Sequence, residues 1–354
     1  MARQTPPIPA LRAPFQDLAR YATEEGRGAF LRMDFNEGPP PDLPRLARAL
    51  ALCASTATVY PEYGALRQAA AKAWDVAPEG VLPVNGADEG IALTVRAFTG
   101  PGAALAIPVP TFPMYRLYAE ACGTPVLPVP LRPDFQVDGE ALAAALPDAA
   151  MLALATPNNP TGRAVPEGDL VRLLEAARGL PVLLDETYAP FCGQDFAHLL
   201  ARFSNLLVLR TLSKAHGLPG LRCGFLLGDA RLIERLDALR SPFNVNGLAA
   251  ALGALMLGEP GLRGRLARAV AARRRLQARL DTAGLRTVPS DTHFFLADLG
   301  GRAAAAVAAL RASGILVKDL GRTLPGFLRI SVAGDPEAER FQEAFLPWFA
   351  GGAR

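Results

Sequence analysis

Between residue 81 and about residue 227, short apolar runs alternate with stretches of helical length. Short strands that are separated by helices indicate βαβ units and a mostly parallel sheet. Two of the runs, at 151–155 and 181–184, are apolar almost throughout, which is typical of strands buried on both faces. The predicted strands lie near residues 81–84, 103–107, 125–129, 150–155, 181–185, 205–210 and 223–227. We therefore predict an α/β fold built on a mostly parallel sheet.

The pattern changes after about residue 229, where helical stretches dominate to residue 282. Strand-like runs at 293–298 and 327–332 then alternate with helical runs at 301–312 and 335–348. We interpret this part as a second, smaller α+β layer, and we expect the Pro-rich N-terminal segment to pack with it. The expected divisions are an N-terminal segment at 1–40, a large domain at 41–245 and a small C-terminal domain at 246–354.

The composition excludes several classes of protein. Half of the 354 residues are apolar, and the formal net charge is only +3, which argues against a dedicated nucleic-acid binder. The four cysteines are scattered and the three histidines do not cluster with them, so we expect neither a metal site nor a disulfide framework. No apolar run is long enough to span a membrane, and residues 1–7 lack the apolar core of a secretory signal. We expect a cytoplasmic protein with no membrane or nucleic-acid partner.

The positive charge of this chain is carried almost entirely by arginine, since only three of its 37 Lys and Arg residues are lysines. Arg stays protonated in proteins, so an amine that must attack a carbonyl has to be a Lys. Lys72 lies in a predicted surface helix, where solubility accounts for it. Lys214 follows Ser213 and precedes Arg222 by eight residues, with glycines between them. This combination predicts a phosphate-binding site built around an amine.

Polar clusters follow four of the predicted strands, at the edge where open α/β sheets bind their ligands. The clusters are Asn85-Gly86-Ala87-Asp88, Thr156-Pro157-Asn158-Asn159-Pro160-Thr161-Gly162, Asp185-Glu186-Thr187-Tyr188 and Thr211-Leu212-Ser213-Lys214. The first opens a helix, whose N-terminal N–H groups can bind a phosphate. Asp185 comes directly after an apolar strand and needs a cation to meet it. An amine, an acid, a phenol, an amide and a phosphate cradle are together the groups that pyridoxal 5′-phosphate uses.

The same motifs resemble those of a known family, the fold-type I, pyridoxal-phosphate-dependent class I/II aminotransferases. The resemblance rests on Asn159-Pro160-Thr161-Gly162, Asp185-Glu186-Thr187-Tyr188 and Ser213-Lys214 with Arg222. Further segments are similar to the histidinol-phosphate aminotransferases: Asp34-Phe35-Asn36-Glu37, Tyr60-Pro61, Gly86-Ala87-Asp88-Glu89-Gly90, Gly220-Leu221-Arg222-Cys223-Gly224-Phe225 and Leu328-Arg329-Ile330-Ser331-Val332. The resemblance spans about residues 30–345. It implies a three-layer, mostly parallel sheet with a smaller α+β domain, and a homodimer with shared active sites.

The resemblance also implies a role for each matching residue. Lys214 forms the imine with the cofactor and then moves a proton, and Asp185 pairs with the ring nitrogen. The remaining cofactor contacts are Tyr188 and Asn159 at the ring hydroxyl, Phe112 stacked on the ring, and Thr211, Ser213, Arg222 and the backbone of Ala87 and Asp88 at the phosphate. Tyr60 matches a tyrosine that reaches the phosphate from the neighbouring subunit. Arg329 matches the arginine that anchors the substrate's acidic group, and Asn36 and Lys318 belong to the substrate side.

The chain departs from the histidinol-phosphate pattern on the substrate side. Phe112 stands where Tyr is usual, so a hydroxyl is lost while stacking remains. Lys318 stands where Arg is frequent, so the planar fork that suits a phosphate is missing. The usual Asn-Glu-Asn-Pro reads Asn36-Glu37-Gly38-Pro39. For the N-terminal tyrosine that contacts the substrate, Phe15 and Tyr21 are both candidates.

The expected reaction is transamination, with histidinol phosphate and 2-oxoglutarate giving imidazole acetol phosphate and glutamate. One alternative is an aromatic or broad-specificity 2-oxo-acid aminotransferase on the same scaffold. Another is a decarboxylase of the threonine-phosphate type, which would release CO₂ and need no 2-oxo acid. A regulator without catalysis usually carries a fused DNA-binding module, and the chain has no spare segment of that size.

Overall fold

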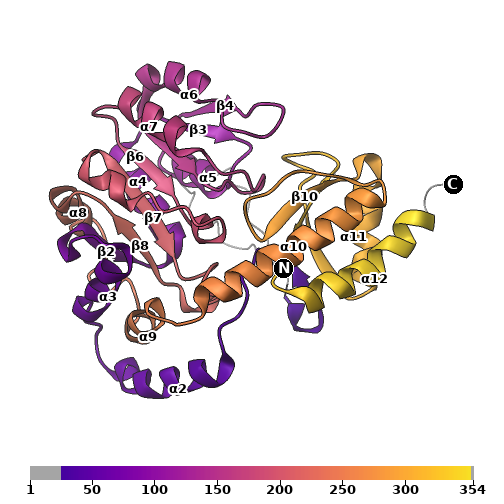
Figure 1. Cartoon of the computed structure of the whole chain (residues 1–354). Helices are drawn as coiled ribbons and strands as arrows, with labels where there is room; N and C mark the ends of the chain where they lie inside the picture. Colours follow the sequence, from indigo (N-terminus) through magenta and orange to yellow (C-terminus); the bar gives the residue numbers. More distant parts are fainter. Residues whose placement is uncertain (1–24, 352–354) are drawn as a thin grey trace, which may run out of the picture.

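The computed structural model describes residues 25–351, which form two sheets with helices packed on them. In Figure 1 the larger sheet and its helices lie on the left and the smaller sheet on the right, and the long helix α10 (Leu262–Thr282) runs from one to the other. Among the described residues, no helix combines the length and the apolar composition that crossing a membrane requires.

The larger sheet has seven strands in the order β2-β8-β7-β6-β5-β3-β4. They are β2 (Val81–Val84), β3 (Ala104–Val109), β4 (Val126–Pro130), β5 (Ala149–Ala155), β6 (Val182–Asp185), β7 (Leu206–Thr211) and β8 (Gly224–Leu227). Strands β3 to β7 pair in parallel, and β8 is antiparallel to both of its neighbours. The prediction of an α/β fold on a mostly parallel sheet is confirmed.

Successive residues of the central strands face opposite sides of this sheet. Leu152 and Leu154 of β5 belong to one apolar cluster, whereas Met151 and Ala153 belong to another on the other face. The first cluster includes residues of α3 (Gly64–Trp74), α6 (Gly139–Ala145), α7 (Glu167–Ala176) and α9 (Gly247–Leu257), and the second includes residues of α4 (Gly86–Phe98), α5 (Met114–Ala121) and α8 (Ala230–Asp237). Because helices cover both faces, these strands need apolar residues at every position, and this explains the continuous apolar runs.

The smaller sheet has five strands in the order β1-β11-β12-β10-β9. They are β1 (Leu31–Met33), β9 (Arg286–Thr287), β10 (Phe294–Asp298), β11 (Ile315–Asp319) and β12 (Phe327–Ser331), with α11 (Ala303–Ala312) and α12 (Asp335–Gly351) nearby in the chain. β1 pairs in parallel with β11, so the chain enters the smaller sheet before it builds the larger one. A cluster that includes Phe295, Ile330, Leu310 and Phe341 forms the core of this layer.

The limits of the two domains remain predictions. α9 packs against α3, and its buried residues Ala249, Leu252 and Met256 belong to a core cluster of the larger sheet. This packing favours a division after α9 over one at 245/246. α2 (Leu43–Cys53) also packs against α9. Short 3-10 turns complete the described chain: η1 (Arg27–Ala29), η2 (Ala54–Thr58), η3 (Pro78–Gly80), η4 (Leu146–Asp148), η5 (Ala189–Phe191), η6 (Ala197–Ala201), η7 (Pro219–Leu221) and η8 (Gly300–Arg302).

Candidate functional site

Strand register brings the four predicted polar clusters to one edge of the larger sheet. Ala155 at the end of β5 pairs with Asp185 at the end of β6, and Asp185 pairs with Leu209 of β7. On the other side, Gly224 of β8 pairs with both Thr211 of β7 and Val84 of β2. The segments that follow β5, β6, β7 and β2 therefore start beside one another, as the sequence predicted.

The start of α4 and the loop after β7 form a cradle of hydrogen-bond donors. Arg222 places Nη1 3.4 Å from Ser213 Oγ and Nη2 3.1 Å from Asp88 Oδ2. Thr211 Oγ1 donates to Ser213 Oγ at 2.9 Å. The first N–H groups of α4, at Ala87 and Asp88, have no partner within their own helix, as at every helix start. These groups suit an anion such as a phosphate.

Gly86 keeps this cradle open. Its φ is +71°, and a Cβ at this position would lie 2.3 Å from Nη2 of Arg222. A side chain at residue 86 would thus both strain the backbone and displace the guanidinium. The sequence here gathers hydrogen-bond donors around a helix N-terminus, and the arrangement fits a phosphate monoester.

Asp185 is a buried carboxyl held from two sides, with a relative exposure of only 6%. Tyr115 donates its hydroxyl to Oδ2 at 2.6 Å, and the N–H of Thr187 donates to Oδ1 at 2.9 Å. Burial raises the pKa of Asp185, and the two donated hydrogen bonds act against that rise. Within residues 25–351 no Lys or Arg forms an ion pair with it. A buried anion in this setting is suited to a cationic group of a ligand.

Lys214 is half-buried, and its Nζ donates to the main-chain oxygen of Phe35 at 2.8 Å. Burial, followed by the positive charge of Arg329, lowers the pKa of Lys214 to about 8. At neutral pH this amine is therefore more often unprotonated than an ordinary lysine. An unprotonated amine is the form that attacks a carbonyl or takes up a proton.

Residues 34–38 approach Lys214 closely at Phe35 and Gly38, and we call them the strap. Within it, Asn36 is buried with φ at +51°, and its Nδ2 donates to the hydroxyl of Tyr188 at 3.1 Å. Its Oδ1 is a buried atom for which the described residues offer no hydrogen-bond partner. Gly38 stands where the histidinol-phosphate aminotransferase pattern has Asn. A Cβ there would lie 1.7 Å from the main-chain oxygen of Lys214, so this close approach requires glycine.

Arg329 connects the smaller sheet with the edge of the larger one. Its Nη1 donates to Oδ1 of Asn159, and its Nη2 donates to the main-chain oxygen of Asp34 at 2.5 Å. Because Oδ1 of Asn159 is bonded in this way, the amide Nδ2 of that residue is oriented away from Arg329. Lys318 pairs with Arg329 across β11 and β12, and burial followed by the charge of Arg329 lowers the pKa of Lys318. Two cations thus stand side by side next to the strap.

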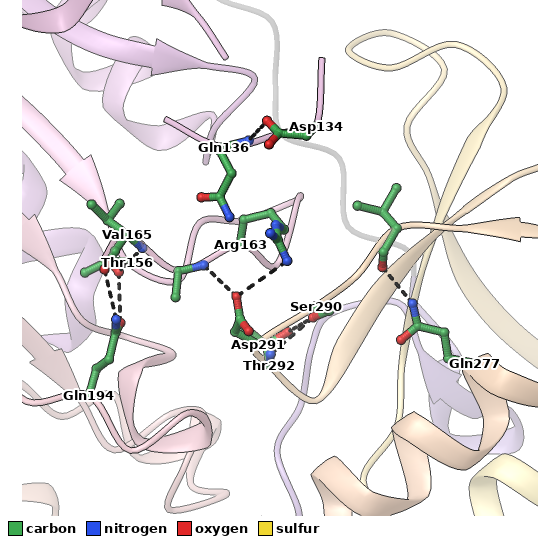
Figure 2. Close-up of polar contacts among 12 residues, drawn as sticks. Asp134, Gln136, Thr156, Arg163, Val165, Gln194, Gln277, Ser290, Asp291 and Thr292 are labelled. Atoms are coloured by element: carbon green, nitrogen blue, oxygen red, sulfur yellow. Dashed lines mark hydrogen bonds and ion pairs between the residues drawn. The ribbon is translucent and has the colours of Figure 1, made fainter. Parts of the chain in front are cut away.

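The turn that carries Asn159 is fastened to the loop before β10. Asp291 N donates to the oxygen of Gly162 at 2.7 Å, and Asp291 Oδ2 accepts from the N–H of Ala164 at 2.9 Å. Figure 2 shows Arg163 reaching the same carboxylate, with Nη1 to Oδ2 at 3.9 Å. The Oγ of Ser290 lies so close to Gly162 that a Cβ there would be 2.4 Å from it. These contacts fix the position of Asn159 relative to the smaller sheet.

The two aromatic candidates have different surroundings. Phe112 is half-buried, and its ring meets that of Tyr115 edge to face at 6.1 Å. Tyr60 is 76% exposed and stacks on Phe243 at 4.3 Å, and Phe243 is itself 49% exposed. The N-terminal candidates Phe15 and Tyr21 lie outside the described residues.

Two residues near the site were missed by the sequence analysis. Tyr115 carries the hydrogen bond to Asp185, and no local motif marks it as anything but a core aromatic. His293 is completely buried, and its ring stacks on Phe191 at 4.1 Å. Burial, together with the charge of Lys214, lowers the pKa of His293 to about 3, so its imidazole is neutral. Over the described part of the chain, no group of His, Cys, Asp or Glu side chains could hold a metal ion.

Comparison with known proteins places this geometry in a family. The family described as aminotransferase class I and II matches residues 32–343. The chain belongs to the class I and II aminotransferases. A histidinol-phosphate aminotransferase of Thermococcus gammatolerans is 38% identical to this aminotransferase over 287 residues, which are 81% of this chain and 81% of that protein.

Two solved structures are similar to this aminotransferase over most of its length. The histidinol-phosphate aminotransferase of Sinorhizobium meliloti, in complex with pyridoxal 5′-phosphate, has a TM-score of 0.84 and 26% identity, and the match covers 91% of this chain and 92% of that one. The L-threonine-O-3-phosphate decarboxylase of Porphyromonas gingivalis has a TM-score of 0.78 and 26% identity, with 90% and 99% covered. This fold is therefore shared with an enzyme named for each of the two candidate reactions, transamination and decarboxylation.

The residues of this aminotransferase fit pyridoxal phosphate. The cradle that a Cβ on Gly86 would fill suits the phosphate, and the buried carboxyl of Asp185 suits a protonated ring nitrogen. The lowered pKa of Lys214 suits an amine that bonds to an aldehyde.

Proposed function

We propose that this pyridoxal-phosphate-dependent aminotransferase transfers the amino group of histidinol phosphate to 2-oxoglutarate, giving imidazole acetol phosphate and glutamate. The family match supports a reaction between an amino donor and a 2-oxo acid. Relatives named histidinol-phosphate aminotransferase, at 33–38% identity over most of the chain, support the choice of donor.

The observation that carries this proposal is the pairing of Lys318 with Arg329. Residues directly opposite each other in antiparallel strands have their side chains on the same face of the sheet, so the two cations can reach one ligand group. A phosphate monoester carries nearly two negative charges at neutral pH, whereas a carboxylate carries one. Two adjacent cations therefore suit a phosphorylated donor, and the guanidinium of Arg329 also suits the carboxylate of a 2-oxo acid in the second half-reaction.

The proposed roles of the residues follow from their surroundings. When bound, pyridoxal phosphate supplies an electron sink for the bond that breaks at the substrate carbon. As a neutral amine, Lys214 Nζ would take the proton from that carbon and pass it to the cofactor carbon that receives the amino group. Asp185 would hold the ring nitrogen protonated, and Phe112 would stack on the ring. Tyr188 and Nδ2 of Asn159, whose orientation Arg329 sets, would hydrogen-bond the ring hydroxyl.

The donor cradle would hold the phosphate of the cofactor. Its members are Thr211, Ser213, Arg222 and the backbone N–H groups of Ala87 and Asp88. The carboxylate of Asp88 forms an ion pair with Arg222 at 3.1 Å, and this contact fixes the direction of the guanidinium. Asn36 lies in the strap and lines the substrate side, where its buried Oδ1 can accept a hydrogen bond from the donor.

We infer a homodimer with shared active sites from the exposed aromatic pair. Tyr60 and Phe243 stack on each other and leave large apolar surfaces in water, and Val59, next to Tyr60 in the sequence, and Leu52 are also exposed. Such a patch is typical of a protein interface. Pairing of two chains there would let Tyr60 complete the phosphate site of the partner. We also propose that the enzyme works in the cytoplasm and binds neither nucleic acid nor membrane.

A panel of donors tests the choice of substrate. Histidinol phosphate, phenylalanine, tyrosine and threonine phosphate are each mixed with the enzyme, and conversion of the cofactor's visible band is followed. The proposal expects fast conversion by histidinol phosphate and recovery of the band by 2-oxoglutarate. Conversion by phenylalanine or tyrosine alone would favour an aromatic aminotransferase. Release of CO₂ from threonine phosphate without a 2-oxo acid would favour the decarboxylase.

A further inference from the structure

Tyr115 lies beneath the cofactor site with no accessible surface. It is the second residue of α5, one turn beyond Phe112, and its side chain enters the core between α5 and the larger sheet. Its hydroxyl donates to Oδ2 of Asp185 at 2.6 Å. The two residues are 70 positions apart in the sequence, so only the fold brings them together.

The hydroxyl of Tyr115 has an unusual acceptor for a buried tyrosine, because it donates to a carboxylate. A buried phenol must place its hydroxyl on some acceptor, and most find a main-chain carbonyl. Tyr63, for example, is also buried and donates to the main-chain oxygen of Val245 at 2.8 Å. Tyr115 donates instead to a carboxylate, and Thr187 N occupies the other oxygen of that carboxylate. Both oxygens of Asp185 are thus held, and its plane is fixed.

The hydrogen bond from Tyr115 shifts the pKa of Asp185 in one direction. A hydroxyl that donates to a carboxylate stabilises the ionised form over the protonated one. Burial of Asp185 acts in the opposite direction and raises its pKa, and the bond from Tyr115 offsets part of that rise. A proton shared between Asp185 and a ring nitrogen would move toward the carboxylate if Tyr115 were lost. It would move toward the nitrogen while Tyr115 donates.

We propose that Tyr115 is a positioning residue that keeps Asp185 ionised and aimed, so that the ring nitrogen of pyridoxal phosphate stays protonated. This rests on the proposed role of Asp185. Tyr115 touches neither substrate nor cofactor in this account and acts only through the carboxylate. The alternative is that Tyr115 merely fills the core, and the two readings differ in what happens at the ring nitrogen.

The test measures the protonation of the ring nitrogen directly. Wild type, Tyr115→Phe and Asp185→Asn are each loaded with cofactor labelled with ¹⁵N in the ring, and the nitrogen resonance is recorded. Tyr115→Phe should move the resonance toward that of an unprotonated pyridine, in the same direction as Asp185→Asn. It should also lower kcat by roughly tenfold to a hundredfold, the worth of one hydrogen bond to a charged group. Phe keeps every carbon of the side chain, so the core remains filled.

A double-mutant cycle distinguishes positioning from packing. If Tyr115 acts only through Asp185, then Tyr115→Phe should change neither the resonance nor kcat when it is made in the Asp185→Asn background. Tyr63→Phe is the matched control, because it also removes a hydroxyl from a buried tyrosine but one bonded to a main-chain oxygen. It should leave the resonance at the wild-type position.

The outcomes separate this inference from the proposal on which it rests. If Asp185→Asn leaves the resonance unchanged, the role of Asp185 is wrong. If Asp185→Asn moves the resonance and Tyr115→Phe does not, only the inference about Tyr115 is wrong. An effect of Tyr115→Phe that persists in the Asp185→Asn background would also overturn it, because Tyr115 would then act by another route.

Discussion

Gly38 lies against the main-chain oxygen of Lys214, so closely that a Cβ on Gly38 would come within 1.7 Å of that oxygen. The contact joins the strap to the loop that carries the candidate catalytic amine. On the same side, Nζ of Lys214 donates to the oxygen of Phe35, also in the strap. The backbone and the side chain of Lys214 are therefore both held by residues 34–38, and the position of the amine depends on the strap.

Gly38→Ala tests this dependence. The added methyl group must push the strap away from Lys214, and overpacking of this kind costs about 1–3 kcal/mol of the free energy of unfolding. The same displacement should weaken the bond from Lys214 to Phe35 and lower kcat. Thermal unfolding and steady-state rates measure both effects. Gly28→Ala is the control, since a Cβ at Gly28 would meet no atom within 4 Å. Wild-type rates in Gly38→Ala would show that the strap does not position the amine.

The lowered pKa of Lys214 predicts its reactivity in the cofactor-free protein. The amine should be labelled by an acylating reagent with a midpoint near pH 8, because the pKa is lowered from 10.5 to about 8. Arg329→Gln should raise that midpoint, since Arg329 contributes to the lowering. Between pH 8 and pH 10.5 the folded chain binds fewer protons at this site than the unfolded chain, so the free energy of unfolding should rise with pH across that window. Mass spectrometry of the labelled peptides gives the midpoint, and a midpoint at the ordinary value would contradict the prediction.

Arg329→Lys should weaken both half-reactions. Lys lacks the planar fork and cannot bond Asn159 and Asp34 while also holding an acidic group. The expected loss is about 2–4 kcal/mol of transition-state stabilisation with histidinol phosphate and with 2-oxoglutarate. Arg286→Lys, at an arginine with a largely exposed side chain on β9, serves as the control. Equal kcat/KM for wild type and Arg329→Lys with both substrates would remove Arg329 from the substrate site.

Subunit exchange tests the shared site. Tyr60→Phe protein and Lys214→Ala protein are each expected to have reduced activity, by loss of a phosphate contact and of the amine. If Tyr60 serves the partner's site, mixed dimers contain one site in which both residues are native, and activity should rise after mixing. Tyr60→Phe keeps the stacking on Phe243, so the interface is preserved. A monomer at micromolar concentration in sedimentation would contradict the shared site.

The strands of the larger sheet could be predicted because burial on both faces forces apolar residues at consecutive positions, as in Leu152, Ala153 and Leu154. The polar clusters at their ends were equally visible, since each follows such a run. β11 was not predicted as a strand, because its second half reads Lys318-Asp319 and is less buried than its first half. A strand that carries charged residues loses the pattern by which strands are recognised.

Contacts between distant segments could not be predicted from local sequence. The bond between Tyr115 and Asp185 depends on how α5 packs on the larger sheet, and nothing near either residue signals it. The bond between Arg329 and Asn159 likewise depends on the fastening of the Gly162 turn to Asp291. Sequence patterns identified candidate residues such as Asp185 and Arg329 but not Tyr115, and the fold determines which residues touch.

The role of Lys214 is tested most directly by finding where the cofactor is attached. The holoenzyme is reduced with borohydride, digested, and its peptides are mapped by mass spectrometry. With only three lysines in the chain, each possible site gives a distinct peptide. If Lys214 forms the imine, the mass of the reduced cofactor appears on Lys214 alone, and Lys214→Arg shows neither the label nor turnover. A label on Lys72 or Lys318, or turnover by Lys214→Arg, would contradict this role.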